Sequence, residues 1–145
     1  MQNMSFVENT IELTHIAALE MLRAAVIAAE EINQPQCIVI VDKSGETLAQ
    51  LRMTGAKYLS LKSARAKART AASIGAPSQA IPPQVAPLIA AATGGEVTGL
   101  GGGLPIYINS VLVGGIGVGS GSPEQDTAVG TAALAAISAR SDAMS

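Results

Sequence analysis

A chain of 145 residues suits one domain with one hydrophobic core, so we treat residues 1–145 as a single domain. A net charge of −2 argues against a nucleic-acid partner, and no apolar run approaches the roughly 20 residues that cross a bilayer. The start of the chain lacks the basic and apolar segments of a secretory leader, and a single cysteine precludes an internal disulfide, so we expect a cytoplasmic protein. Hydrophobic residues make up 48% of the chain and aromatic residues only 2%, which predicts a core of small aliphatic side chains.

The N-terminal part of the chain predicts an arm, a helix and a first hairpin. Thr14 is a suitable N-cap for the helix, and Pro35 lies just beyond its expected end. A turn at residues 42–45 then separates two strand patterns. The predicted elements are an arm over residues 1–12, a helix over 14–32, a buried strand over 36–42 and a return strand over 46–53.

The middle of the chain predicts a long helix followed by an irregular segment. The helix covers about residues 57–74, and it ends at Gly75 with Pro77 just beyond, which is common stop chemistry. Residues 77–94 contain four prolines, so we expect at most one short helix there.

A second hairpin spans residues 104–119 and turns at Asn109-Ser110. With a two-residue turn, strand alternation divides its apolar side chains between two faces. One face carries Ile106, Ile108, Val111 and Val113, and the other carries Tyr107, Leu112, Ile116 and Val118. Because both faces are apolar, this part of the sheet needs cover on each side, from helices or from another subunit.

The last predicted helix runs over residues 123–137, and a tail covers residues 139–145. Ser122 fits the N-cap, Pro123 the first helical position, and Gln125 completes a capping box.

Eleven of the 15 glycines lie between Gly94 and Gly121, which raises the question of a phosphate-binding loop. The pattern G-x-x-x-x-G-K-[ST] is absent, and the run after Gly115 has serine where G-x-G-x-x-G needs its third glycine. We therefore expect no nucleotide cofactor. Repeated glycines in a strand indicate that something approaches its backbone closely, and a packed helix, a neighbouring subunit or a ligand would each do so.

Five of the nine Lys and Arg residues lie within residues 57–69. On a helix, Tyr58, Lys62, Arg65 and Arg69 fall within an arc of about 60°, at the edge of an apolar stripe of Leu61, Ala64, Ala68 and Ala71. Like charges at this spacing repel each other unless an anion lies among them. A ligand carboxylate, a native Asp or Glu, or a plain solvated helix face would each explain the pattern. Lys57 and Lys67 lie outside the arc, so we expect them to matter little for ligand binding.

The sequence offers few metal ligands. His15 is the single histidine, which excludes zinc sites built from several His and Cys residues, and we predict no metal site. His15, Tyr58, Met53 and the threonines are the candidate donors to a haem iron, and Cys37 could also contribute. No C-x-x-C-H attachment motif is present. Cys37 lies in an apolar run and is expected to be a buried thiol.

Three blocks carry a resemblance to a known family: VDKSGETLAQLRM, KARTAASIGAPS and GGGLPIYINSVLVGGIGVGSGSPEQD. The chain resembles the GlcG/HbpS-like family, also called the haem-degrading domain family, over nearly its whole length. It is also similar to the C-terminal domain of PduO-type cobalamin adenosyltransferases. The resemblance implies an α+β fold, a profilin-like antiparallel sheet with helices packed against it, that assembles into homo-oligomers from dimers to octamers.

The resemblance also implies function, because haem or a related tetrapyrrole is a proposed ligand of several members. We expect an oligomeric small-molecule binding protein with haem as the leading ligand. A lyase acting on a small aromatic carboxylic acid, like hydroxylaminobenzoate lyases, a haem-degrading activity, or an assembly protein without a ligand are the alternatives. The candidate residues for an anionic ligand are Tyr58, Lys62, Arg65, Arg69, Gly101, Gly102, Gly103 and Gly119, and the catalytic candidates are Tyr58, Lys62 and Glu96.

Overall fold

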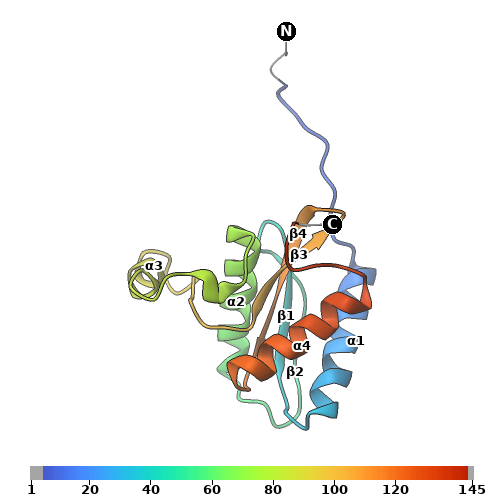
Figure 1. Cartoon of the computed structure of the whole chain (residues 1–145), viewed down its shortest axis with the longest axis vertical. Coiled ribbons are helices and arrows are strands. Elements are labelled where there is room, and N and C mark those ends of the chain that lie inside the picture. The colour runs from blue at the N-terminus through green and yellow to red at the C-terminus, as the bar shows by residue number, and fades with distance from the viewer. Residues whose placement is uncertain (1–4, 144–145) are drawn as a thin grey trace.

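Four antiparallel strands form one sheet in the order β2-β1-β4-β3, which places the two hairpins side by side. The computed structural model describes residues 5–143. The strands are β1 (Cys37–Asp42), β2 (Thr47–Arg52), β3 (Gly103–Ile108) and β4 (Val111–Gly119). Helix α2 (Ser60–Ile74) covers one face, and α1 (His15–Glu31) and α4 (Pro123–Ala136) cover the other (Figure 1). The predicted α+β fold, one antiparallel sheet with helices packed against it, is confirmed.

The ends of the helices follow the local signals in the sequence. The Thr14 side chain accepts a hydrogen bond from the Ala17 N–H and caps α1. Ser122 and Gln125 form the predicted capping box at the start of α4. Helix α2 ends at Gly75, which adopts a left-handed conformation with φ of 67°.

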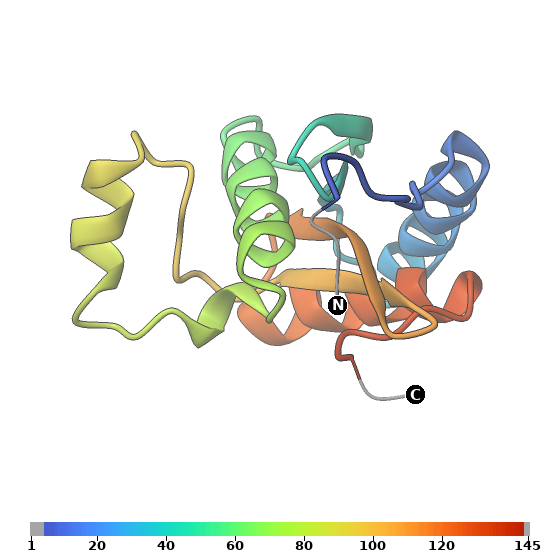
Figure 2. The same cartoon turned by 90° about the horizontal axis from the view of Figure 1, so that it is seen from above.

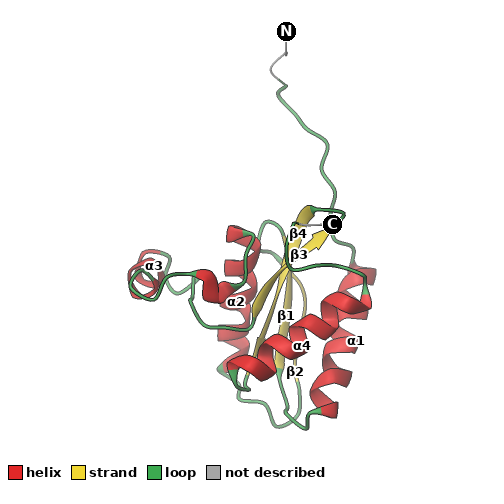
Figure 3. Ribbon diagram, in the orientation of Figure 1, coloured by secondary structure: helices red, strands yellow, loops and turns green. Residues whose placement is uncertain are grey.

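One helix boundary differs clearly from the prediction, and the proline-rich segment contains the single short α-helix that was expected at most. Helix α2 begins at Ser60, because residues 57–59 form a tighter turn in which the Leu61 N–H bonds to the Tyr58 carbonyl. Tyr58 therefore precedes the helix on which the arc was drawn. The proline-rich segment contains a 3₁₀ turn, η1 (Ser78–Ala80), and one short helix, α3 (Ala86–Ala92), joined by long loops (Figure 3).

The second hairpin turns where predicted, but its faces differ. Asn109 and Ser110 have positive φ values of 50° and 66°, which the tight turn requires. A register shift follows Ile106, and a bulge moves every later residue of β4 to the other face. Ile116 and Val118 therefore pack with Ile106 on the side of α1 and α4, and the prediction that they share a face with Tyr107 and Leu112 was wrong.

The sheet separates two cores of different character. On the side of α1 and α4, large aliphatic side chains fill the space, including Met21, Ile38, Ile40, Ile106 and Ile116. On the side of α2 the core contains Cys37, Val39 and Val41 from β1 and alanines from the helix. Helices of the same chain thus cover both faces of the hairpin.

The two ends of the described chain differ in their contacts with the rest of the domain. Residues 5–12 are exposed and extend away from the body (Figure 1). After α4, Arg140 exchanges two backbone hydrogen bonds with Tyr107, of 2.8 and 2.9 Å, and so adds a bridge to the edge of β3. The outer parts of the predicted arm and tail, residues 1–4 and 144–145, lie outside the described residues. Within residues 5–143, no helix is both long and apolar enough to cross a membrane.

Candidate functional site

The predicted cations share one side of α2, but that side points away from the sheet. Lys62 and Arg65 are exposed and Arg69 is half-buried. The prediction that the cations border the buried face holds for Arg69, whose side chain is 21% exposed, but not for Lys62 and Arg65, which are open to solvent. Neither Lys62 nor Arg65 forms an ion pair within residues 5–143, so both lie on a solvated helix face.

Arg69 finds its anions within the chain. Its guanidinium pairs with Glu96 and lies 4.0 Å from a carboxylate oxygen of Glu46, and its Nε donates to the Gly45 carbonyl at 2.9 Å. A native carboxylate is therefore the partner, which was one of the alternatives left open by the sequence. Arg69, Glu96 and Gly45 border a cavity of about 740 Å³ that Lys43 also lines.

Tyr58 and Glu96, two of the catalytic candidates, lie in different places. Tyr58 is exposed and lines a cavity of about 440 Å³ with Lys57, Ser60 and Ser63. Glu96 lies beside Arg69, which is roughly 16 Å further along the axis of α2 at 1.5 Å per residue. The structure thus brings Arg69 and Glu96 together but does not bring Tyr58 or Lys62 to them.

The repeated glycines of β4 lie against α2. A Cβ atom at Gly117 would collide with the backbone of Ala64 and Ala68, and one at Gly115 would collide with the Ala68 carbonyl. The close approach predicted from these glycines is therefore made by a packed helix of the same chain. Gly103 and Gly119 face the same helix, at Lys67 and Ser60.

The other candidate glycines also contact protein atoms. A Cβ atom at Gly101 would lie 2.8 Å from Oε1 of Gln79. Gly102 has φ of 114°, and a Cβ atom there would lie 2.6 Å from the Val118 carbonyl oxygen and 3.2 Å from Nζ of Lys67. Only glycine fits this passage of the loop between Val118 and Lys67.

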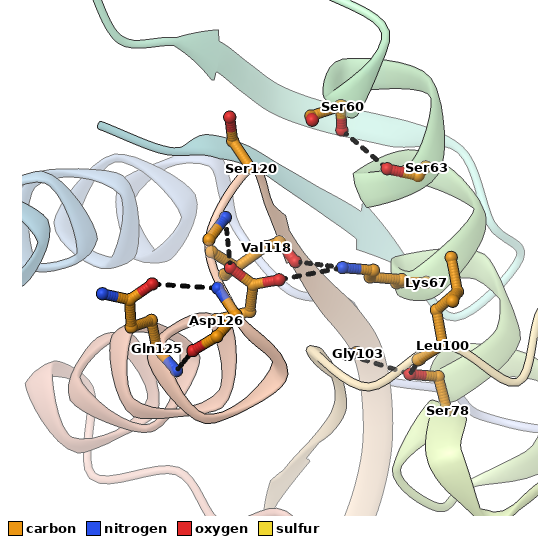
Figure 4. Close-up of polar contacts among 12 residues, drawn as sticks. Ser60, Ser63, Lys67, Ser78, Leu100, Gly103, Val118, Ser120, Gln125 and Asp126 are labelled. Atoms are coloured by element: carbon orange, nitrogen blue, oxygen red, sulfur yellow. Dashed lines mark hydrogen bonds and ion pairs between the residues drawn. The ribbon is translucent and has the colours of Figure 1, made fainter. Parts of the chain in front are cut away.

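A buried ion pair joins three elements beneath this loop (Figure 4). Lys67 Nζ lies 3.1 Å from Asp126 Oδ2 and donates to the Val118 carbonyl at 2.8 Å. Asp126 Oδ1 accepts from the Gly121 N–H at 3.0 Å, and the two side chains of the pair are 6% and 3% exposed. Sequence reasoning missed this pair, because the two residues are 59 positions apart and Lys67 was judged only by its position outside the arc.

Two further buried polar groups lie in this region. The Ser78 hydroxyl accepts from the Gly103 N–H at 3.0 Å and donates to the Leu100 carbonyl, which holds the glycine loop to η1 (Figure 4). The Gln36 side chain is fully buried, and neither its nitrogen nor its oxygen has a hydrogen-bond partner in the described chain. Its Nε2 lies close to Gly121, beside Asp126.

The candidate iron donors differ in accessibility. His15 is the first residue of α1 and is exposed, whereas Met53 Sδ is occupied by the Gln36 N–H at 3.4 Å. Cys37 is buried as predicted, and this burial raises the pKa of its thiol, although Arg52 opposes the shift. Within residues 5–143, no group of three His, Cys, Asp or Glu side chains is placed to hold a metal ion.

Comparison with known proteins adds two kinds of match. A family model described as haem degrading protein HbpS-like matches residues 13–135. The corrinoid adenosyltransferase PduO of Citrobacter freundii is 35% identical over 126 residues, which cover 83% of this chain. The chain corresponds to only 38% of the length of that relative.

Solved structures match over nearly the whole chain. A complex of PduOC with haem superposes with a TM-score of 0.84 at 29% identity, covering 91% of this chain and 99% of that one. Protein ORFY of Klebsiella pneumoniae superposes with a TM-score of 0.90 at 30% identity, covering 94% and 98% of the two chains.

Proposed function

The chain belongs to the HbpS-like family of haem-degrading proteins, and from this premise we propose that it is a homo-oligomeric protein that binds haem or a related tetrapyrrole without covalent attachment. The observation that carries the proposal is the haem complex of a relative whose fold matches this chain almost from end to end. A haem protein needs an accessible iron donor, an apolar surface for the porphyrin and a cation for the propionates, and these requirements can be compared with the residues present.

We propose that the iron donor lies on the outer face of α1. Among the candidate donors, Met53 is engaged and Cys37 is buried as a thiol, whereas His15 and Tyr58 are exposed. His15 is the better iron ligand of the two, because a neutral imidazole coordinates iron without first losing a proton. We therefore propose His15 as the axial ligand.

The surroundings of His15 favour a flat, partly apolar, anionic ligand. Leu19 and Arg23 follow His15 at four-residue intervals, so the three side chains lie on one side of α1. Leu19 and the neighbouring Ile16 are exposed, although both are large and apolar, and Arg23 is exposed as well. Haem would supply the iron and its redox chemistry, while Leu19 and Ile16 would cover the porphyrin and Arg23 would pair with a propionate.

Hemin titration of the apo-protein tests this proposal. We expect a saturable shift of the Soret band, and we expect His15→Ala to change the position of that band because it removes the imidazole. Tyr58→Phe, which removes the other exposed donor, is the matched control and should leave the spectrum as in the unmodified protein. A Soret band no different from that given by an unrelated apolar protein would contradict haem binding. A shifted band that His15→Ala leaves unchanged would contradict only the ligand assignment.

The cavity beside Arg69 favours a second candidate, a lyase acting on a small aromatic carboxylic acid. Arg69 and Lys43 would anchor the carboxylate there, and Glu96 is a carboxylate within the same cavity that would move a proton. Glu96 already pairs with Arg69, so a substrate would have to compete for the guanidinium. For this reason haem binding ranks first, and the lyase becomes the leading candidate if hemin causes no shift.

A further inference from the structure

Helix α3 is the one helix of the described chain that buries none of its residues. It lies in an excursion over residues 77–101 that leaves the body beside α2 and returns to β3 (Figure 2). Within residues 5–143 it has no extensive contact with any other helix or strand. An isolated helix of seven residues is not stable in water, because the few hydrogen bonds of so short a helix do not offset the cost of nucleation. Within the described residues α3 packs against its own return loop, where the Ala86 Cβ lies close to Gly99, and this contact leaves Leu88 free to meet a partner.

Hydrogen bonds hold both ends of the excursion to the body of the domain, so the excursion is not a loose loop. Ser78 ties the start of the excursion to Leu100 and Gly103. At its other end the Thr70 hydroxyl bonds to the Glu96 carbonyl and to the Thr98 N–H. The excursion thus presents α3 outward from an ordered base.

The composition of the excursion suits a permanent protein interface. No Asp, Glu, Lys or Arg occurs between Thr70 and Gly95, and the charges on either side of this stretch, Arg69 and Glu96, neutralise each other. The exposed aliphatic side chains include Leu88, which is 71% exposed, and the exposed polar ones, Gln79 and Gln84, are neutral. Depletion of charge combined with exposed aliphatic surface is the pattern of an interface core and not of a solvated loop.

From these observations we infer that α3 and its flanking loops form a two-fold interface with the same segment of a second copy of this chain. A two-fold axis lays a patch against itself, so any charge near its centre would meet the same charge. A stretch without charge meets this condition, whereas it offers nothing to attract a nucleic acid or an anionic membrane. Stable interfaces use about 20–30 residues from each partner, and the excursion is of that size.

This inference rests on the proposed homo-oligomer and assigns it a surface. The test is the mass of the full chain by size exclusion with light scattering, over a dilution series, for the variants Leu88→Asp and Leu88→Arg. Each variant places a like charge opposite itself, so both should raise the apparent dissociation constant by about a hundredfold or more, and salt should partly restore assembly. Ile27→Asp is the matched control, since Ile27 is also aliphatic and exposed but lies on α1. It should leave the mass unchanged.

Hydrogen exchange gives a second readout that does not depend on mass. In the unmodified assembly the amides of residues 89–92 should be protected, and in both Leu88 variants they should exchange at least about tenfold faster while the sheet stays protected. Because α3 buries nothing in its own chain, both variants should keep the circular dichroism spectrum of the folded domain.

The possible outcomes separate this surface from the proposed function. If only Leu88→Arg weakens assembly, α3 faces a cationic surface of its neighbour and the two-fold contact is wrong. If the oligomer persists unchanged in both variants, the surface is wrong while the oligomer stands. A single-chain mass of 14.6 kDa for the unmodified protein would overturn both, and the hemin titration would still decide haem binding independently.

Discussion

At the scale of single residues, the Lys67–Asp126 pair is a buried ion pair that joins three elements of the fold. Both side chains are almost fully removed from water, so each charge has lost its hydration. Each recovers part of that loss from the other and from a backbone group, the Val118 carbonyl for Lys67 and the Gly121 N–H for Asp126. The pair therefore joins α2, β4 and the start of α4, and neither charge is tolerable without its partner.

A double-mutant cycle tests this dependence. Lys67→Met alone should lower the free energy of unfolding by about 3–5 kcal/mol, because Asp126 is left as an unpaired buried carboxylate. Lys67→Met combined with Asp126→Leu should recover most of that loss, since two apolar side chains of similar size need no partner. Urea unfolding measures all the variants. Equal losses in the single and double variants would show that the pair contributes packing and not electrostatic compensation.

The sequence predicted which cations share one side of α2, but it did not predict which carboxylates pair with them. The grouping of Lys62, Arg65 and Arg69 on one side of α2 followed from helical spacing alone. The anions of Arg69 could not be predicted, because Glu96 reaches it only through the path of the excursion, and Asp126 reaches Lys67 only through the packing of α4 on the sheet.

At the scale of elements, the contact between β4 and α2 explains the glycines of β4. Side chains on this face of the strand would keep the helix at an ordinary distance, whereas glycine lets the backbones meet. The backbone carbonyl of Ala64 occupies the place that a Cβ atom of Gly117 would take. A rigid helix backbone cannot move aside as a flexible side chain does, so this position tolerates no larger residue.

Gly117→Ala should therefore lower the free energy of unfolding by about 3 kcal/mol or more, at the upper end of overpacking effects, or prevent folding. Gly130→Ala is the control, because its Cβ atom would meet mainly the mobile end of the Leu104 side chain, at 3.1 Å, and alanine favours a helix. We expect that variant to lie within about 1 kcal/mol of the unmodified protein. Thermal or urea denaturation of the two variants measures these losses. A small loss of unfolding free energy for Gly117→Ala would mean that α2 can shift along the sheet.

The helix ends, which depend on nearby residues, were predicted well. The bulge in the second hairpin, which depends on pairing between strands, was not. Thr14, Ser122 with Gln125, and Gly75 fix helix ends through bonds within a few residues, which a sequence pattern can represent. The bulge beside Ile106 depends on how β4 pairs with β3 and β1 at once, and alternation counted from the turn cannot detect it. One extra residue there reversed the assignment of Ile116 and Val118.

At the scale of the whole molecule, the sheet separates the two surfaces proposed for ligands. The His15 face of α1 lies on one side, and the cationic face of α2 and the cavity beside Arg69 lie on the other (Figure 1). A single haem on one chain cannot reach both. If haem binds at His15 as proposed, haem and an aromatic acid would use different cations.

This separation predicts that only one of two exposed arginines, Arg23 and not Arg65, contributes to hemin affinity. Arg23 lies two helical turns from His15 on the same side of α1, so Arg23→Ala should weaken hemin binding by about ten- to hundredfold, the equivalent of one charge-assisted contact. Arg65 is equally exposed but lies across the sheet, so Arg65→Ala should have little effect. Arg23→Lys should recover only part of the affinity, because an ammonium group lacks the fork that binds both propionate oxygens. Soret titrations of the three variants measure these constants directly. If Arg65→Ala causes the larger loss, the α2 face of a neighbouring copy closes over the haem, and the site is built from two chains instead of one.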